Sequence, residues 1–251
     1  MKHALLCTAA VIITTTASAE TFDYSSRDGF AITIPTGWHA ISESQIQEMV
    51  AAIRKAAPTA TVPDFRYGYQ AQTDRWFSYP YVLIWVNPSG RVPEHQLEKI
   101  AKIDLSKSTD KLRSSMGDVV SAFEVGNAAY DPATHIVWMT SEATYSDVGK
   151  VGILSGGVQT EQGIIWVYGY ALRDTFERYK PTFIGITESV QPTEALRYKS
   201  RFSDSAPFAA VIDSVRGIDW SQVLVAGLAG GIIALIIGIF SARKLRKDQK
   251  Q

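Results

Sequence analysis

The feature that most constrains this chain is an uncharged apolar run near its end, from Val223 to Phe240. At a rise of about 1.5 Å per residue, a helix over this run is roughly 27 Å long, close to the ~30 Å hydrocarbon core of a bilayer. We therefore predict one C-terminal transmembrane helix at residues 223–240. The tail at 241–251 is basic, and the positive-inside rule then predicts a cytoplasmic tail and a domain on the opposite side of the membrane. Its basic residues are Arg243, Lys244, Arg246, Lys247 and Lys250.

Small residues form a stripe along this predicted helix. They recur every four residues, with a GxxxG pair beside them, at Ala226, Gly227, Gly230, Gly231, Ala234 and Gly238. Such a stripe lets two helices approach closely. The pattern predicts helix packing in the membrane, either as self-association or as pairing with another membrane subunit. The alternative interpretation is the ordinary abundance of Gly and Ala in membrane helices.

The first 19 residues have the organisation of a signal peptide. Lys2 precedes an apolar stretch from Ala4 to Ile13, and Ala17-Ser18-Ala19 fits a small-x-small cleavage site. An uncleaved signal anchor is the alternative, but the apolar stretch is short for a span. Cleavage would start the mature chain at Glu20 and would remove the single cysteine, so the mature protein would form no disulfide.

The net charge differs between the parts of the chain that are predicted to lie on the two sides of the membrane. The whole sequence has 25 Lys and Arg and 25 Asp and Glu. Without Lys2 and the five basic tail residues 19 Lys and Arg remain, and without Asp248 24 Asp and Glu remain, so the exported part carries a net charge of −5. This charge disfavours nucleic acid as a partner. The sequence has no N-glycosylation acceptor, which favours a bacterial envelope. We predict a single-pass protein of the bacterial inner membrane with a periplasmic domain.

Residues 20–192 are long enough for one domain with a sizeable core. Phe30 to Ile34 alternates between apolar and other residues, which predicts a half-buried strand. Ser42 and Gln45 have the spacing of a capping box at the start of a helix. Apolar residues then recur at helical spacing and predict one buried helix face, at Ile46, Met49, Val50 and Ile53.

The middle of the domain is rich in strands. Tyr79 to Val86 is apolar on both alternating faces, which predicts a central strand covered on both sides. Strands at 119–129 and 135–145 are predicted to pair through the turn Asp131–Thr134, and strands at 150–159 and 164–172 through a similar turn. Consecutive hairpins predict an antiparallel meander.

Further helices are predicted to cover this sheet. One runs from Pro93 to Met116, and a closing helix begins at Pro181 and ends before Gln191-Pro192. The buried stripe of the closing helix is predicted to be Phe183, Ile186 or Ile184, and Val190. The fold class is therefore α+β, an antiparallel β-sheet meander covered by helices, followed by one transmembrane helix.

From Thr193 to Gln222 the composition changes to Ser, Asp, Arg and Ala. We interpret residues 193–222 as a juxtamembrane linker. Two forms of it stay open. One is a disordered stalk, and the other contains a short amphipathic helix lying on the bilayer between Phe208 and Ile218, with Trp220 at the interface.

Two segments resemble a known superfamily. Phe30 to Ser42, FAITIPTGWHAIS, is similar to the opening strand, Pro-x-Gly-Trp turn and first helix cap of the PsbP/Mog1/DcrB-like superfamily. Phe183 to Pro192, FIGITESVQP, is similar to its closing helix. The resemblance covers roughly residues 22–192 by element order and implies the same fold for the exported domain. It also implies a binding or assembly role without catalysis, and it supplies no catalytic residue.

The residues give no reason to expect catalysis. His39, His95 and His135 lie on a turn, a helix and a strand start, with no spacing of metal ligands. Ser155-Gly156-Gly157 lacks the context of a nucleophile elbow, and we interpret it as a β-bulge or a close backbone approach. We therefore predict no catalytic residue, no metal site and no cofactor.

Aromatic residues are the more promising signal. Arg75, Trp76, Phe77 and Tyr79 lie in a connection between strands, where exposed aromatic side chains usually indicate binding. We predict a partner-binding site there, with packing of Phe77 and Tyr79 under the sheet edge as the alternative. Further aromatics alternate along strands and are predicted to pack in the core, at Trp138, Trp166, Tyr168 and Tyr170.

Three function classes follow from these observations. The first is a non-enzymatic, membrane-anchored periplasmic module that binds an unidentified envelope protein, as an assembly or scaffolding factor. The second is a receptor for a small or lipidic ligand, with an aromatic pocket around Trp76, Tyr79 and Trp85. The third, an enzyme, would need a cluster of carboxylates with shifted pKa values in a cleft.

Overall fold

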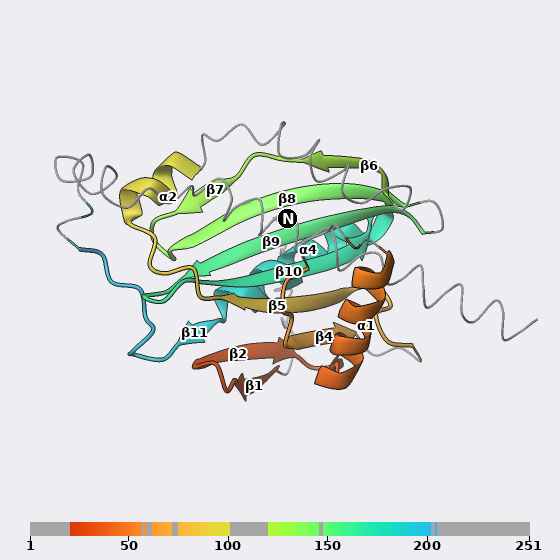
Figure 1. Cartoon of the computed structure of the whole chain (residues 1–251), viewed down its shortest axis with the longest axis horizontal. Coiled ribbons are helices and arrows are strands. Elements are labelled where there is room, and N and C mark those ends of the chain that lie inside the picture. The colour runs from red at the N-terminus through yellow and green to blue at the C-terminus, as the bar shows by residue number, and fades with distance from the viewer. Residues whose placement is uncertain are drawn as a thin grey trace, which may run out of the picture.

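A computed structural model describes residues 21–56, 58, 62–71, 75–100, 120–145, 148–201 and 204. They form an α+β fold around a large antiparallel sheet (Figure 1). The strand order of this sheet is β3 (Trp38–Ala40), β4 (Tyr67–Ala71), β5 (Tyr81–Asn87), β10 (Ile164–Leu172), β9 (Gly149–Gln159), β8 (Ile136–Tyr145) and β6 (Val120–Val125), and β7 (Ala129–Asp131) also pairs with β8. A small sheet has the order β1 (Thr21–Ser25), β2 (Phe30–Pro35) and β11 (Gln191–Pro192).

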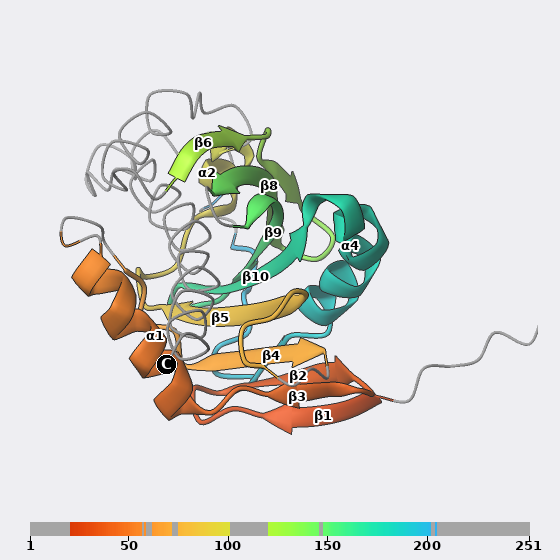
Figure 2. The same cartoon turned by 90° about the vertical axis from the view of Figure 1, so that its right-hand side faces the viewer.

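The described helices cover both faces of the large sheet. They are α1 (Glu43–Ala56), α2 (Glu94–Ile100) and α4 (Arg173–Glu188). Figure 2 shows α1 and α4 on opposite sides of the sheet, with β1 and β2 beneath it. The buried residues accordingly form two clusters. One includes residues of α1 and α2, and the other includes residues of α4 and β2.

The predicted first helix is confirmed as α1. Its capping box is formed: the Ser42 N–H donates to Gln45 Oε1 at 3.1 Å, and the Gln45 N–H donates to Ser42 Oγ at 3.3 Å. The predicted face is buried, since Ile46, Met49 and Ile53 are at most 3% exposed. The amphipathic pattern and the cap therefore place this helix on the sheet.

The central position of β5 and the meander are also confirmed. β5 lies between β4 and β10, and β8, β9 and β10 are consecutive antiparallel neighbours. Tyr81 and Leu83 belong to one buried cluster, and Val82 and Ile84 belong to the other. The two apolar faces seen in the sequence thus face two different cores.

The strand predicted at 119–129 is interrupted. β6 ends at Val125 and β7 begins at Ala129, although both pair with β8. The Gly126 N–H still donates to the Thr140 carbonyl at 2.8 Å, so the chain stays beside β8 across the interruption. At the predicted turn, Asp131 accepts hydrogen bonds from the Ala133 N–H (2.9 Å) and the Thr134 hydroxyl (2.8 Å).

The start of the closing helix was predicted wrongly. Helix α4 begins at Arg173, directly after β10, and Pro181 lies inside it. Pro181 is exposed, so the carbonyl that loses its helical N–H partner is accessible to water. The buried stripe agrees with the prediction at Phe183 and Ile186, whereas Ile184 is half-buried.

Three glycines explain how closely α4 approaches the sheet. A methyl group added to Gly152, Gly156 or Gly169 would overlap Phe176, Thr187 or the Phe183 ring, respectively. Gly156 belongs to the Ser155-Gly156-Gly157 segment, and the register with β8 and β10 continues through it without a bulge. The close backbone approach is therefore the correct one of the two interpretations.

The domain continues beyond residue 192, where the sequence analysis placed the start of a linker. The Tyr198 side chain is 7% exposed and its hydroxyl donates to the Val92 carbonyl at 2.8 Å. The Thr193 N–H donates to the Gly29 carbonyl at 2.8 Å. We call residues 193–204 the C-terminal strap, described here through Arg201 and at Asp204.

Of the longer predicted elements, two lie partly or wholly outside the described residues. The second predicted helix is described only as α2, since residues 101–119 fall outside. The predicted span at 223–240, with its small-residue stripe, falls outside as well. No helix within the described residues is long and apolar enough to cross a bilayer.

Candidate functional site

The predicted partner-binding residues divide between the surface and the core. Trp76 is 43% exposed and Arg75 is also exposed, whereas Phe77 is 7% exposed and belongs to a buried cluster. Gln70 holds this loop from below: its amide nitrogen donates to the Arg75 carbonyl at 2.8 Å, and its amide oxygen accepts from the Phe77 N–H at 2.6 Å. The loop thus presents Trp76 and buries Phe77.

Tyr79 belongs to an aromatic stack inside the domain. Its ring stacks on Tyr81 at a centroid distance of 5.3 Å, and Tyr81 stacks on Tyr170 at 4.7 Å. Burial raises the pKa of all three tyrosines, so they are neutral over the physiological range. Packing under the sheet, the alternative interpretation, therefore describes Phe77 and Tyr79.

The structure does not assemble the aromatic pocket that was predicted for a ligand. Trp76 and Tyr79 precede the start of β5, whereas Trp85 lies near its end. At about 3.3 Å per residue, the strand from Tyr81 at the start of β5 to Trp85 is roughly 13 Å long, so Trp85 lies away from the loop. Trp138 is half-buried, and Trp166, Tyr168 and Tyr170 are fully buried, as predicted for core residues.

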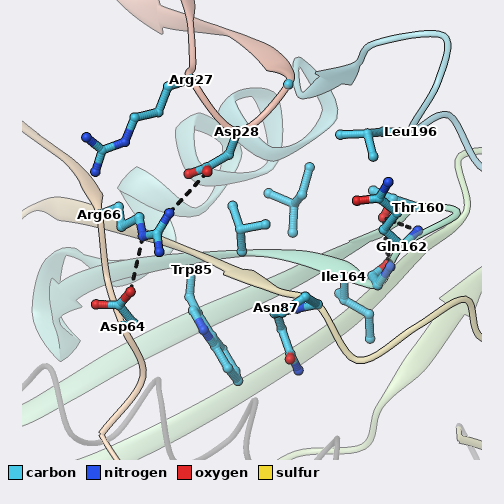
Figure 3. A pocket seen from close by; sticks show the side chains of 15 residues that line it. Arg27, Asp28, Asp64, Arg66, Trp85, Asn87, Thr160, Gln162, Ile164 and Leu196 are labelled. Carbon is cyan, nitrogen blue, oxygen red and sulfur yellow. Dashed lines mark hydrogen bonds and ion pairs between the residues drawn. The ribbon is translucent and has the colours of Figure 1, made fainter.

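A cavity lies at the other end of β5. It is a groove of about 690 Å³, within the range of ligand and peptide sites. Figure 3 shows charged side chains along one wall and the end of the β9–β10 hairpin along the other. The lining comes from five separate segments: Arg27, Asp28, Gly29, Asp64, Arg66, Trp85, Val86, Asn87, Pro88, Thr160, Gln162, Gly163, Ile164, Ile165 and Leu196.

The charged wall is centred on Arg66. Its guanidinium donates to Asp64 at 3.1 Å and to Asp28 at 3.2 Å, and the Tyr67 hydroxyl donates to Asp28 at 2.7 Å. The hydrogen bond to Asp64 and the charges of both carboxylates raise the pKa of Arg66. Burial, followed by the interaction with Asp28, raises the pKa of Tyr67 to about 12. Asp28, Arg66 and Asp64 therefore form a charged triad with a net charge of −1. Arg27 also lines this wall, and it donates to Glu43 at 2.6 Å.

The floor is mainly apolar, and the far wall adds the polar residues Thr160 and Gln162. Val86 and Ile165 lie side by side on β5 and β10, and Leu196 closes the groove from the C-terminal strap. A methyl group on Gly29 would lie 2.8 Å from Leu196, so the strap packs directly against the β1–β2 turn. The groove is thus completed by the segment that leads toward the predicted membrane span.

A second cluster fastens this strap, and we call it the Arg91 clamp. Arg91 donates to Glu161 at 3.0 Å and to the Lys199 carbonyl at 2.7 Å, and it pairs with Asp204. Its guanidinium also lies 4.6 Å from the centre of the Tyr198 ring. Arg91 and Asp204 are 10% and 4% exposed, so the clamp is a nearly buried ion pair.

The clamp carboxylates have lowered pKa values. Burial alone raises the pKa of Asp204, but hydrogen bonds from Arg91 and from the Arg201 N–H outweigh it. The same opposition applies to Glu161, where the Lys199 N–H, Arg201 and Arg91 outweigh burial and lower the pKa. Both groups are ionised at neutral pH and serve to hold the strap.

The histidines are placed apart from one another. His39 is exposed at the edge strand β3, His95 is buried on α2, and His135 accepts or donates a 2.8 Å hydrogen bond with Tyr130. Among the described residues, no group of three His, Cys, Asp or Glu side chains could hold a metal ion. The chemistry that the groove offers is binding through hydrogen bonds, charge and apolar contact.

Sequence reasoning missed the groove because its residues come from separate segments with no common motif. Arg27 and Asp28 lie in a turn, Asp64 and Arg66 precede β4, and Leu196 lies in what was predicted to be a linker. One signal was present. Asp64 and Arg66 are charged residues two positions apart just before β4, but only the fold brings Asp28 to them.

Comparisons with known proteins found solved structures of low similarity to this chain. No family model matches the chain, and no curated protein matches it. The solution structure of cyanobacterial PsbP from Synechocystis is 15% identical, covering 71% of this chain and 95% of that chain, with a TM-score of 0.44.

Two further solved structures cover a comparable share of the chain. The Ran-binding protein Mog1p of Saccharomyces cerevisiae is 9% identical, covering 70% of this chain and 96% of that chain, with a TM-score of 0.39. LpqN of Mycobacterium tuberculosis, described as involved in cell envelope biogenesis, is 13% identical, covering 70% and 92% with a TM-score of 0.37.

Proposed function

We propose that this protein is a non-enzymatic binding module of the bacterial envelope, exported by residues 1–19 and anchored in the inner membrane by residues 223–240. It binds a protein partner on the periplasmic side, as an assembly or scaffolding factor. The groove carries this proposal, because one of its walls is Leu196 of the C-terminal strap. Binding in the groove is thereby joined to the segment that leads to the anchor.

The groove has the composition of a binding surface. It combines an apolar floor with an aromatic side chain, an arginine and polar groups, as the central parts of protein interfaces do. Its charged triad is satisfied internally, so Arg66 and the two carboxylates hold one another in position. A partner finds these groups already arranged, which lowers the entropy cost of binding.

The exposed loop provides a second contact in this proposal. Trp76 is the large apolar residue that is exposed among the described residues, and Arg75 is beside it. Trp and Arg are the residue types most often found at the energetic centres of interfaces. We propose Arg75 and Trp76 as partner contacts, whereas Phe77 and Tyr79 pack in the core.

In-membrane crosslinking followed by affinity purification tests this function. The full-length chain is compared with a variant truncated after Gln222 and with Trp76→Ala. We expect the same envelope proteins to be recovered in repeated experiments with the full chain and to decrease with Trp76→Ala. Loss on truncation would place the membrane helix in the interface. Recovery of the chain alone from native membranes would contradict the proposal.

A receptor for a small or lipidic ligand is the second candidate. One observation favours it: the groove of about 690 Å³ has the size of a small-molecule site, and the aromatic side chain of Trp85 lines it. Native mass spectrometry of the protein extracted from its own membranes tests this. A mass equal to that of the polypeptide alone would contradict it.

A further inference from the structure

Strand β5 extends past the strand that pairs with it on the groove side. The last pair between β4 and β5 is Tyr67 with Ile84, whereas the pairing of β5 with β10 continues to Asn87. Among the described residues, no strand accompanies Trp85 to Asn87 on the side of β4. The groove occupies this position, and its charged wall comes from the residues just before β4.

The backbone direction of β5 can be read from its hydrogen bonds. The Pro80 carbonyl accepts from the Ala71 N–H at 3.3 Å, and the Ile84 carbonyl accepts from the Arg66 N–H at 3.4 Å. In an antiparallel sheet the main-chain groups of alternate residues point to the same side. Val86 is next in this series, so its N–H and C=O point into the groove.

An extended peptide fits this geometry. It would lie beside β5 in the place that β4 leaves, and Val86 would form the main-chain hydrogen bonds of a short added strand. Its alternate side chains would face the apolar floor of Val86, Ile165 and Leu196. The groove of about 690 Å³ has room for such a segment between the floor and the charged wall.

The charge of the groove wall determines which peptide side chains it can bind. The triad has a net charge of −1, and Asp64 uses one carboxylate oxygen for Arg66 while its side chain is 55% exposed. Arg27 lies on the same wall, but its charge is paired with Glu43 at 2.6 Å. A cationic side chain can therefore pair with Asp64 without breaking the triad, whereas an anionic one would meet two carboxylates. The negative charge of the whole exported part acts in the same direction.

We infer that the groove binds an extended segment of the partner protein as a strand added to β5, with a Lys or Arg side chain beside Asp64. This inference rests on the proposed protein-binding function, and it names the chemistry of the partner at this site.

A library of labelled, end-blocked hexapeptides with each position scanned tests the inference on the full-length protein in detergent. We expect selected peptides to carry Lys or Arg at one position and apolar residues at alternate positions. Asp64→Lys should weaken the binding of the best peptide at least tenfold, and Asp64→Asn should weaken it less. Glu188→Lys, an exposed charge reversal at the end of α4, is the control and should leave binding unchanged. Thermal unfolding verifies that each variant is folded.

Backbone methylation distinguishes an added strand from other binding. N-methylation of the peptide amide that donates to the Val86 carbonyl should weaken binding about fivefold to tenfold, because it removes that hydrogen bond, and methylation of the two neighbouring amides, which point away from β5, should not. A flat methylation profile, or binding unchanged by Asp64→Lys, would overturn the inference. If no peptide is selected but envelope partners are recovered, the inference is overturned and the proposed function stands. If neither a selected peptide nor an envelope partner is found, the proposed function is contradicted as well.

Discussion

At the scale of single residues, Arg91 makes the most contacts of any side chain in the clamp. It is paired with Glu161 and Asp204, donates to the Lys199 carbonyl and lies over the Tyr198 ring. A planar guanidinium suits this role, because it can donate in several directions at once and stack on an aromatic ring. A lysine has one charge centre and cannot reproduce this arrangement.

Arg91→Ala is expected to destabilise the domain by about 3 kcal/mol or more, because it leaves Asp204 nearly buried without its cation. Urea unfolding followed by tryptophan fluorescence measures this change. The matched control is Arg197→Ala, whose ion pair with Glu194 is exposed on both sides and should cost about 0.5 kcal/mol or less. Equal effects of the two substitutions would show that the clamp does not hold the strap.

The lowered pKa of Asp204 predicts how the clamp responds to pH. Its folded pKa lies below the ordinary value of 3.8, so the unfolded chain binds protons first as the pH falls. The stabilisation is therefore complete above that value and is lost as the pH falls through the folded pKa. The free energy of unfolding of the native chain should fall between about pH 5 and pH 2, and less steeply in Asp204→Asn. Identical slopes in both proteins would contradict this.

The loop of Arg75 to Tyr79 shows how far the exposure of single residues can be predicted from sequence. Four neighbouring positions looked alike as candidate contacts, yet the structure exposes Arg75 and Trp76 and buries Phe77. The difference comes from Gln70, whose amide bonds both flanking backbone groups from a neighbouring strand. The sequence pattern does not show this contact, because it depends on how the loop lies relative to the end of β4.

At the scale of elements, the packing of α4 depends on the glycines beneath it. Gly152 and Gly156 on β9 and Gly169 on β10 leave space for the Phe176 ring, Thr187 and the Phe183 ring. A strand glycine normally weakens a sheet, so the close contact between helix and sheet compensates for it. The α4 face of the sheet is accordingly specified by small residues in the strands and large ones in the helix.

Gly169→Ala is expected to destabilise the domain by about 1–3 kcal/mol, because the added methyl group would overlap the Phe183 ring. Chemical unfolding measures the change. Gly185→Ala on α4 is the matched control, since nothing lies within 4 Å of the added methyl group. That variant should be more stable by up to about 1 kcal/mol, because alanine favours the helix. A neutral result for Gly169→Ala would mean that α4 can shift away from the sheet.

Elements with a regular apolar period were predictable. The capping box and buried face of α1 and the two-faced β5 follow from spacing alone, and both are confirmed. The start of α4 was not predictable in the same way, because Pro181 is typical of a first helical turn. In the structure Pro181 is tolerated on the solvent side, and the helix begins eight residues earlier.

At the scale of the whole molecule, the strap joins parts that are distant in the sequence. It contacts the β1–β2 turn at Gly29, the β9–β10 hairpin at Glu161 and the segment before α2 at Arg91 and Val92. The polar composition after residue 192 indicated a linker, and composition alone cannot show that Tyr198 and Asp204 find buried partners. The candidate groove was missed for the same reason, since Leu196 forms one of its walls.

The position of the strap predicts where the domain can be shortened. A chain of residues 20–192 loses Tyr198 and Asp204, so it leaves Arg91 facing Glu161 without its second carboxylate and opens the groove at Leu196. It should be less stable than residues 20–206 by about 3 kcal/mol or more, since a nearly buried ion pair is broken. Chemical unfolding of the two proteins, produced without the signal peptide and anchor, measures the difference.

The same pair of proteins separates a structural strap from a functional one. If the best hexapeptide binds residues 20–206 and not residues 20–192, while residues 20–192 remain folded by circular dichroism, the strap is part of the groove as well as of the fold. Equal stability of the two proteins would mean that the clamp contributes nothing and that the domain ends at residue 192. A difference confined to stability would leave the strap as a fastening between the domain and the chain that continues toward the predicted anchor.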